Sequence, residues 1–494
     1  MTQLPTRVLN FAVTVLASVM ISLASATVLL AQSIDATRAK TLTVEQATQL
    51  LKASNSLRLS ATDLSPEVAA VLATYKGELR FEALITLSPE TSAALATRTS
   101  TIDLPKVSTL TSAVAKALAT TKGQLQLMGV KELSNEVAKE LATHTGSLTL
   151  GVTDLSDEAA AALAKHGGNL RLDELKSLTS LVLAERLGQQ EWLFLGGVTN
   201  LTLEIAKAIC PPENRVKFKN HVQLYIGLTK LPVDVAAAIM AGRGHISANS
   251  LETISDEAAT AWSGPFANIR LFGLKKLSPA AGASLAKGSG IFDIRLFGPE
   301  LSDETAAAIA KQMAAGPHRM IDFNGLKKLS SPAFAVAVLR RYQQGPHSTL
   351  SGVAEITDDV AQALAEYQGN LNGLPSLTSL KSAPLAAKYA SQRGDVVFRK
   401  LTTIPDDVAA ALATHKGKLD LSGLKSLSLP AARAFAAHEG ELILDGLEEM
   451  GDEAAATLAK AKDSVSLKAL KKISPAARAA LGANPKIAIK TSAN

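Results

Sequence analysis

Short stretches that alternate apolar and polar residues recur along this chain, each followed by an alanine-rich stretch with helical spacing. In residues 124–127 and 441–444 every second position is apolar, which predicts a strand with one buried face. A turn follows, and then a run of about ten residues that predicts a helix. Ser or Thr stands at the expected N-cap, and a glycine such as Gly123 or Gly168 stands at the expected helix end.

The expected N-caps recur at nearly constant spacing, with most steps of 22 or 23 residues. A fixed period of this size is typical of a solenoid, in which each repeat packs mainly on its neighbours. We therefore expect an α/β fold, a single solenoid of about 19 repeats over residues 43–494, with parallel strands on one face and helices on the other. The expected N-caps are Thr43, Ser65, Ser88, Thr111, Ser134, Ser156, Thr179, Thr202, Pro232, Ser255, Ser278, Ser302, Ser330, Thr357, Ser382, Pro405, Ser428, Gly451 and Ser474.

The repeat resembles the leucine-rich repeat family, in the form found in exported bacterial proteins. The matching motif is Leu-Ser/Thr-Asp-Glu followed by an Ala-rich run, as in residues 155–164, and the resemblance covers nearly all of the chain after residue 42. It implies a binding protein and no enzyme. The family's Asn or Cys after the strand is replaced by Val130, Leu274 or Leu424. We therefore expect the family's buried asparagine ladder to be missing.

The N-terminal segment has the pattern expected of an export signal. Residues 8–31 form an almost unbroken apolar run behind Arg7, and Ala24-Ser25-Ala26 offers a small-residue cleavage site. Residues 1–31 are expected to be either a cleaved signal peptide or an uncleaved transmembrane anchor, since the run is also long enough to span a bilayer. Residues 32–42 would be a short linker. The protein is then expected in the cell envelope or periplasm, or secreted, and it contacts a membrane solely through this segment if uncleaved.

Composition and motifs exclude several classes of function. The net charge is +6 over 494 residues with no basic tail, so nucleic-acid binding is not expected. One cysteine rules out an intramolecular disulfide. No phosphate-binding loop, nucleophile elbow or zinc-helix motif occurs, so we expect no catalysis and no cofactor.

Four histidines share one place, two residues before a glycine: His144, His166, His415 and His438. Because tyrosine fills the same place at Tyr75, we expect these side chains to cap helix carbonyls. A two-histidine metal site on adjacent rungs is the alternative.

A series of lysines occupies the turn between strand and helix. Stacking would align them along one edge, where they could attract an acidic polysaccharide or an anionic lipid surface. The alternative is a solvated rim with neighbouring acidic residues. The lysines are Lys131, Lys176, Lys230, Lys275, Lys276, Lys327, Lys328, Lys425, Lys471 and Lys472.

The aromatic residues are unevenly distributed, and most lie between Trp192 and Tyr342. Residues between and just after the apolar positions of a strand point outward. By this rule Arg270 and Phe272 are exposed together, Arg295 and Phe297 follow on the next rung, and Phe194 has the same place earlier. We predict that Phe194, Arg270, Phe272, Arg295 and Phe297 form a surface for a protein or polysaccharide partner. The alternatives are that these rings fill the core, and that the whole body is a structural spacer of the cell envelope.

Overall fold

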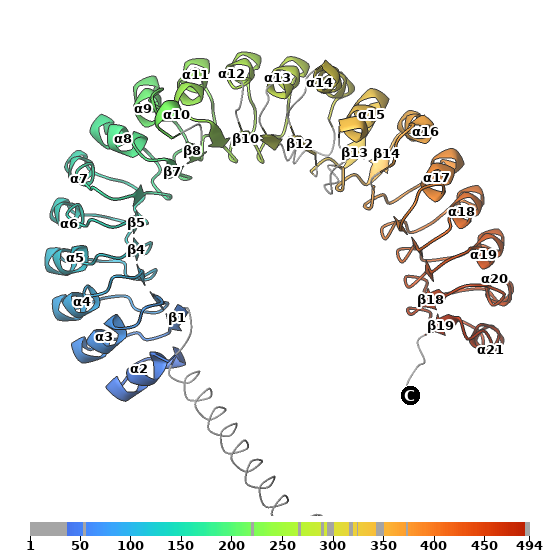
Figure 1. Ribbon diagram of the computed structural model, residues 1–494, viewed down its shortest axis with the longest axis horizontal. Helices are drawn as coiled ribbons and strands as arrows, with labels where there is room; N and C mark the ends of the chain where they lie inside the picture. The colour runs from blue at the N-terminus through green and yellow to red at the C-terminus, as the bar shows by residue number, and fades with distance from the viewer. Residues whose placement is uncertain are drawn as a thin grey trace, which may run out of the picture. The chain divides into compact units, whose positions relative to one another are not determined.

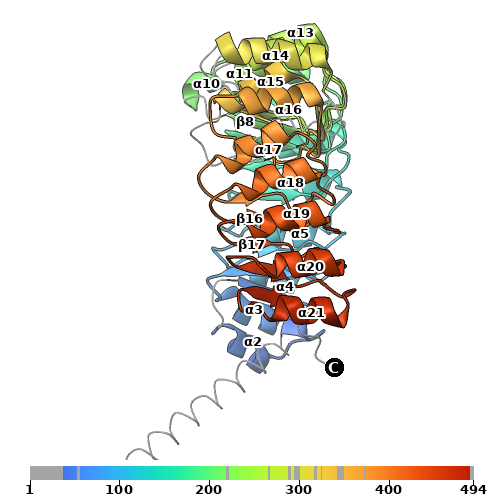
Figure 2. The same ribbon diagram turned by 90° about the vertical axis from the view of Figure 1, so that its right-hand side faces the viewer.

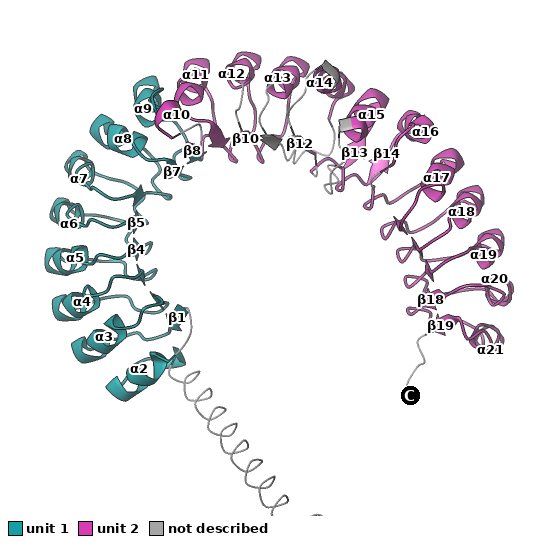
Figure 3. Cartoon of the chain, in the orientation of Figure 1, with its two compact units in different colours: residues 1–214, 224–226 teal, residues 215–223, 227–494 magenta. Residues whose placement is uncertain are grey.

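The computed structural model describes most of the chain beyond residue 36 and divides it into two compact units. Unit 1 ends at residue 214 and adds residues 224–226, and unit 2 holds residues 215–223 and those from 227 onward (Figure 3). The described residues are 37–52, 56–218, 222–264, 268–287, 291–293, 301–315, 320–323, 325–341, 350–371 and 374–489.

The predicted signal or anchor, residues 1–31, lies outside the described residues. Within them, no helix combines the length and the apolar character needed to cross a membrane. The described end of the predicted linker is joined to the first repeat, because Ser60 N donates to Thr37 O and Thr62 N donates to Lys40 O.

Unit 1 alternates one helix with one strand, and Figure 1 shows its helices on one side and its strands on the other. Its helices are α2 (Val44–Leu50), α3 (Pro66–Ala73), α4 (Pro89–Leu95), α5 (Ser112–Ala119), α6 (Asn135–Leu141), α7 (Asp157–Leu163), α8 (Leu181–Gly188) and α9 (Leu203–Ile209). Its strands are β1 (Ser56–Leu59), β2 (Glu78–Phe81), β3 (Ile102–Asp103), β4 (Leu125–Leu127), β5 (Leu148–Leu150), β6 (Leu170–Arg171), β7 (Trp192–Leu195) and most of β8 (Gln223–Ile226).

Unit 2 continues the same alternation, and Figure 2 shows α17 to α21 as successive rungs. Its helices are α11 (Val233–Gly242), α12 (Asp256–Ala261), α13 (Pro279–Ala286), α14 (Asp303–Ala315), α15 (Pro332–Arg341), α16 (Asp358–Glu366), α17 (Ala383–Ala390), α18 (Asp406–Ala413), α19 (Leu429–Ala436), α20 (Asp452–Leu458) and α21 (Pro475–Gly482), with most of the short α10 (Asn214–Lys217). Its strands are β9 (His245–Ser247), β10 (Asn268–Arg270), β11 (Ile291–Asp293), β12 (Met320–Asp322), β13 (Lys328–Leu329), β14 (Glu355–Ile356), β15 (Val396–Val397), β16 (Leu419–Asp420), β17 (Leu442–Ile443), β18 (Val465–Leu467) and β19 (Ile487–Ile489).

The strands pair in parallel with their predicted neighbours. β1 to β6 form a six-stranded sheet in unit 1, and β15 to β19 form a five-stranded sheet in unit 2. In β4, Leu125 and Leu127 are fully buried while Gln126 between them is half-exposed. We call this middle position the outward slot. The α/β solenoid predicted from the repeat is confirmed within each unit.

The helices begin close to where the sequence predicts. At most repeats the predicted Ser or Thr hydroxyl accepts the N–H of the third helical residue, as Ser156 accepts from Ala159. Two predictions are one residue early, because Ser180 caps α8 where Thr179 was expected and Ser331 caps the next predicted helix in place of Ser330. Ser331 is the N-cap because the next residue, Pro332, is suited to the first helical position.

The glycines do not cap the helices as predicted. Helix α5 ends at Ala119, with Thr120 as its C-cap, before Gly123 is reached. A Cβ on Gly123 would overlap the carbonyl of Ser100 in the preceding repeat. These glycines therefore serve close approach between neighbouring repeats, which leaves no room for a side chain.

Three of the four predicted histidines confirm the capping prediction, with one change: each accepting carbonyl belongs to the preceding repeat. His144 Nδ1 lies 3.4 Å from Ala119 O at the end of α5, and His415 Nδ1 lies 3.0 Å from Ala390 O at the end of α17. His438 Nδ1 likewise lies 3.2 Å from Ala413 O. These contacts link each of the three histidines to the end of the helix in the preceding repeat.

Candidate functional site

Aromatic side chains stack on one another at outward slots of unit 1. Phe194 occupies the slot of β7, and Tyr225 occupies the corresponding place on β8. Their ring centroids lie 4.8 Å apart and their planes differ by 7°. On the preceding strand, Arg171 fills the slot of β6 and places its Cζ 4.0 Å from the Phe194 centroid. Because β6 and β8 flank β7, both faces of the Phe194 ring are covered.

Trp192 completes this cluster at the start of β7. Its ring lies 6.5 Å from that of Phe194, with an angle of 23° between the planes. The Trp192 side chain is 50% exposed, whereas Phe194 and Tyr225 are half-buried. We call Arg171, Trp192, Phe194 and Tyr225 the aromatic ladder. It is a surface feature and does not fill the core, which the flanking Leu193 and Leu195 supply.

The aromatic ladder differs from the rest of its row. Pairing of β1 to β6 places Arg58, Arg80, Asp103, Gln126 and Thr149 in register on the preceding outward slots. These residues are polar, and the first three lie within a network of ion pairs that includes Glu82. Apolar rings begin at β7, so the chemistry of the sheet surface changes there.

Sequence reasoning identified one member of the ladder, Phe194, and missed the other three. The signal was present: Trp192 and Phe194 alternate with buried leucines in β7, as Tyr225 does in β8. The outward-slot rule, applied to every repeat, would have brought Arg171 and Tyr225 beside Phe194.

In unit 2, Arg270 is exposed as predicted, whereas Phe272 is only partly exposed. Arg270 is exposed at the end of β10 and Phe272 just beyond it is half-exposed, with its N–H donating to Asn249 Oδ1 at 3.4 Å. The next rung differs from the prediction, because Asp293 is the Cα partner of Arg270 where Arg295 was expected. Strand β11 starts earlier than the spacing suggested, and Phe292 is the Cα partner of Ile269.

Two of the predicted site residues, Arg295 and Phe297, lie outside the described residues. Phe194 belongs to unit 1 and Phe272 to unit 2. A single surface that joins all five predicted residues therefore stays a prediction.

The turn lysines contact carboxylates of neighbouring repeats. Lys275 Nζ lies 2.6 Å from Glu252 Oε1, and Lys425 Nζ lies 2.9 Å from Glu448 Oε1. The hydrogen bond from Lys425, together with its charge, lowers the pKa of Glu448. These pairs favour the solvated rim over an open basic surface, since the acidic partners come from the turns of adjacent repeats.

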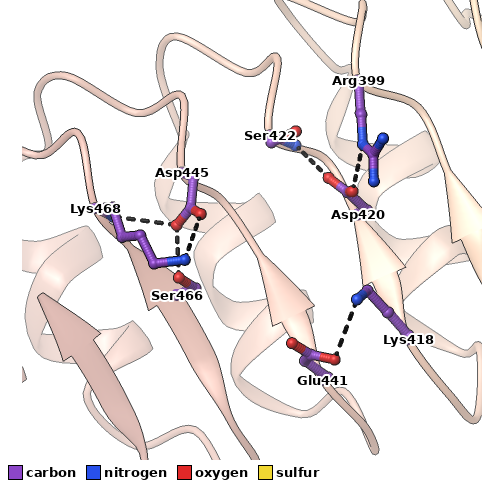
Figure 4. Close-up of polar contacts among 8 residues, drawn as sticks. All are labelled: Arg399, Lys418, Asp420, Ser422, Glu441, Asp445, Ser466 and Lys468. Carbon is purple, nitrogen blue, oxygen red and sulfur yellow. Dashed lines mark hydrogen bonds and ion pairs between the residues drawn. The ribbon is translucent and has the colours of Figure 1, made fainter. Parts of the chain in front are cut away.

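At the C-terminal end of unit 2, the sheet surface is polar (Figure 4). Asp420, in the outward slot of β16, is buried and accepts hydrogen bonds from Arg399 Nε at 2.7 Å and from Ser422 N at 3.1 Å. Burial would raise the pKa of Asp420, but the hydrogen bonds from Arg399 and Ser422 outweigh it and lower the pKa. The carboxylate is therefore a structural acceptor.

The neighbouring rungs repeat this arrangement, as Figure 4 also shows. Asp445 accepts from Ser466 Oγ at 2.6 Å and from Lys468 Nζ at 3.2 Å. Lys418 Nζ lies 3.4 Å from Glu441 Oε2. These charges pair with one another across the rungs, which gives a cross-linked polar surface.

The stacked histidines gave the alternative of a metal site. The His144 and His166 rings stack at 5.9 Å, and those of His415 and His438 at 6.4 Å. Within the part of the chain that the structure describes, no group of three or more His, Cys, Asp or Glu residues could hold a metal ion.

A groove of about 830 Å³ lies on the helix side of unit 2, among α14, α15 and α16. Half of the residues that line it are alanines, and Met313, Val336, Lys311 and Arg340 are among the others.

No family model matches the chain, and no curated protein matches it. The parallel one-strand, one-helix repeat is the deciding observation. The fold is that of a leucine-rich repeat solenoid. Among solved structures, the chain is similar to a leucine-rich repeat protein of Leptospira interrogans, at 16% identity and TM-score 0.33, over 85% of this chain and 96% of that one.

Two further leucine-rich repeat structures are similar at the same distant level. An internalin of Listeria monocytogenes has 12% identity and a TM-score of 0.28, over 92% of this chain and 90% of that one. A chain of the Drosophila Toll–Spatzle complex has 12% identity and a TM-score of 0.31, over 76% of this chain and 43% of that one. At these values the likenesses do not bear on function.

Proposed function

We propose that this protein is a non-enzymatic binding scaffold that engages a protein or glycan partner through its strand surface. The observation that carries the proposal is the aromatic ladder. Trp192 is a large apolar side chain left 50% exposed. Exposed aromatic residues next to an arginine have the composition of an interface centre.

The energetics of the repeat support this assignment. The core of each rung is supplied by the residues on either side of the outward slot, such as Leu193 and Leu195. A ring in the slot therefore adds little to folding, but covering it by a partner removes apolar surface from water. Burying an aromatic or large aliphatic side chain is worth about 1.5–3 kcal/mol.

Export through residues 1–31 is part of the proposal, and its support is the apolar run behind Arg7 in the sequence. Fusion of this segment to a reporter that is active solely in the periplasm tests it directly. A reporter retained in the cytoplasm would refute export. The mass of the mature N-terminus separates a cleaved signal from a retained anchor.

The binding function is tested by affinity capture from envelope extract on the full-length protein. The Trp192→Ala, Tyr225→Ala double variant is compared with the wild type and with Thr149→Ala, which alters the outward slot of β5. We expect at least one component to be retained by the wild type and by Thr149→Ala and lost from the double variant. Equal retention by all three proteins would refute binding at the ladder and favour the structural spacer.

A further inference from the structure

We infer that the groove among α14, α15 and α16 binds a free amphiphile with one alkyl chain and an anionic head group, such as a fatty acid. This site lies on the helix side of unit 2 and does not depend on the aromatic ladder. The inference follows from the volume of the groove, from the apolar part of its wall and from the two cations at one end of it.

The groove lies beside an unusually long helix. Helix α14 has 13 residues, whereas α13 has 8 and α16 has 9. The α13 side of α14 is in close contact, because a Cβ added to Gly282 would lie 3.1 Å from side-chain carbons of Thr305 and Ile309. On its other side α14 is followed by α15 (Figure 1), and here an opening of about 830 Å³ is left. Small-molecule sites typically have volumes of about 300–1,000 Å³.

One part of the groove is apolar and accessible. The first two turns of α15 contribute Pro332, Ala333 and Val336, and α14 contributes Ala307. Ala307 and Ala333 are exposed and Val336 is half-buried, so this surface reaches solvent in the free protein. An alkyl chain that covers it removes apolar area from water, which favours binding. The short alanine side chains leave room for such a slender chain.

The charged residues that line the groove are both cations, Lys311 and Arg340. Each stands nine residues after the N-cap of its helix, which is Ser302 for α14 and Ser331 for α15. Since successive helices of the solenoid run in the same direction, the two cations lie at the same level, near the helix C-termini. Both are exposed, and in the described part of the chain neither is paired with a carboxylate. An anionic head group at this end can accept charge-assisted hydrogen bonds from both.

The exposed acids around the groove favour a small ligand over a broad anionic surface. Glu304 in the first turn of α14, Asp358 at the start of α16 and Glu366 at its end are exposed and do not line the groove. A bilayer with anionic lipids or an acidic protein helix would meet these carboxylates as well as the two cations. A molecule that lies inside the groove meets the cations.

A cation near a helix C-terminus also has a structural role, because it offsets the negative end of the helix dipole. Lys287 supplies the matched control for this role. It is exposed and stands nine residues after Ser278, the N-cap of α13, but it is not among the residues that line the groove. Lys287→Gln therefore removes the same charge from the same helical position outside the site.

Isothermal titration calorimetry of the full-length protein with dodecanoate, below the concentration at which it forms micelles, tests the inference. We expect saturable binding by the wild type. Lys311→Gln and Arg340→Gln should each weaken it at least about threefold, and together at least about tenfold, because each removes a charged donor to the head group. Lys287→Gln should change the affinity by less than about twofold, and the neutral dodecanol should bind the wild type at least about tenfold more weakly than dodecanoate.

A second pair of variants tests the apolar part. Ala333 is exposed, so Ala333→Trp places a large side chain over the groove without entering the core. Ala476, also exposed, follows a Ser-Pro pair in the same way at the start of α21 and gives the control Ala476→Trp. We expect Ala333→Trp to lose dodecanoate binding at least tenfold and Ala476→Trp to keep it, with unchanged circular dichroism of both. Because the apolar residues 8–31 can also bind an amphiphile, the differences between variants define the site.

The outcomes separate this site from the proposed function of the strand surface. Equal dodecanoate binding by the wild type, the cation variants and Ala333→Trp would refute the site and leave the aromatic ladder untouched. Dodecanol binding as tight as that of dodecanoate would refute the role of the cations. Flotation with phosphatidylglycerol vesicles that is lost from Lys311→Gln, Arg340→Gln, without a difference in dodecanoate binding, would show that the cations meet a membrane surface and that the inferred ligand is wrong.

Discussion

Replacement of Arg98 is the strongest test of how side-chain hydrogen bonds hold successive repeats together. Its side chain is 1% exposed, and its guanidinium donates back into the preceding repeat. Nη1 donates to Leu72 O at 2.9 Å and to Tyr75 O at 2.8 Å, and Nη2 donates to Gly77 O at 2.7 Å. Arg98→Met keeps most of the length and apolar volume but removes all three donors. We expect this variant to be clearly less stable than the wild type.

The magnitude follows from the contacts that are lost. A hydrogen bond to a charged group contributes about 1.5–3 kcal/mol, and a buried carbonyl left without a donor costs about 1–3 kcal/mol. Three such bonds give at least about 4.5 kcal/mol before any compensation. Burial lowers the pKa of Arg98, which shows that the charge is held there at a cost. Removing the charge returns part of that cost, so we expect a net loss of about 2–4 kcal/mol.

Urea unfolding followed by circular dichroism measures the loss, and hydrogen exchange locates it. Because each repeat of a solenoid contacts mainly its neighbours, protection should fall first at the amides of α3, β2 and α4. Lys76→Met is the matched control, since it removes one positive charge from an exposed side chain in the same repeat boundary. Unfolding free energies of Arg98→Met and Lys76→Met within about 0.5 kcal/mol of each other would refute the argument.

Three further predictions concern changes at single residues. Burial, followed by the charges of nearby basic groups, lowers the pKa of His166, so the unfolded chain binds more protons. The contribution of His166 to the unfolding free energy is then complete at pH values above the unfolded pKa of about 6.5. As the pH drops under that value, the contribution decreases by at most about 1.4 kcal/mol per pH unit. Urea unfolding of His166→Gln should therefore show a flatter pH dependence of the unfolding free energy than the wild type, and an unchanged slope would contradict this. Gly168→Ala should cost roughly 1–3 kcal/mol in thermal unfolding, because its Cβ would overlap the carbonyl of Gly146, whereas the adjacent Gly167→Ala meets no atom and should lie within about 0.5 kcal/mol of the wild type. Equal effects of the two alanines would show that neighbouring repeats can move apart. Phe272→Ala should lower the unfolding free energy by less than about 1 kcal/mol, and a larger loss would place this ring in the core.

The helix starts could be predicted from the sequence because their determinants are local. A hydroxyl side chain and the backbone N–H that it caps lie three residues apart, so a short stretch of sequence is enough to predict where the helix begins. The two errors of one residue occurred where adjacent hydroxyl residues compete, as at Ser330 and Ser331. There Ser330 Oγ instead donates to Asp303 Oδ1 at 2.6 Å, a contact 27 residues away that no local pattern reveals.

The roles of the glycines and the register of β11 could not be predicted, because both depend on the neighbouring repeat. Gly168 follows a helix like a C-cap glycine, yet its constraint is a carbonyl of the preceding rung. The pairing of Arg270 with Asp293 is a contact between rungs that the spacing of the repeats does not reveal. Spacing alone gives the period of a solenoid, and the contacts between rungs decide the local departures from it.

The difference between buried and outward positions also explains why the sequence identified only one member of the aromatic ladder. Apolar positions at Leu193 and Leu195 are dictated by the core and reveal the strand, but the residue between them is unconstrained by folding. The surface that this residue helps to form is recognised when the outward slots of consecutive strands are compared, since Phe194 contacts both Arg171 and Tyr225 across the rungs. A solenoid can therefore change its surface from ion pairs to stacked rings while its buried pattern stays the same. For such a protein, the row of outward slots contains the information about function, and it has to be examined across the repeats.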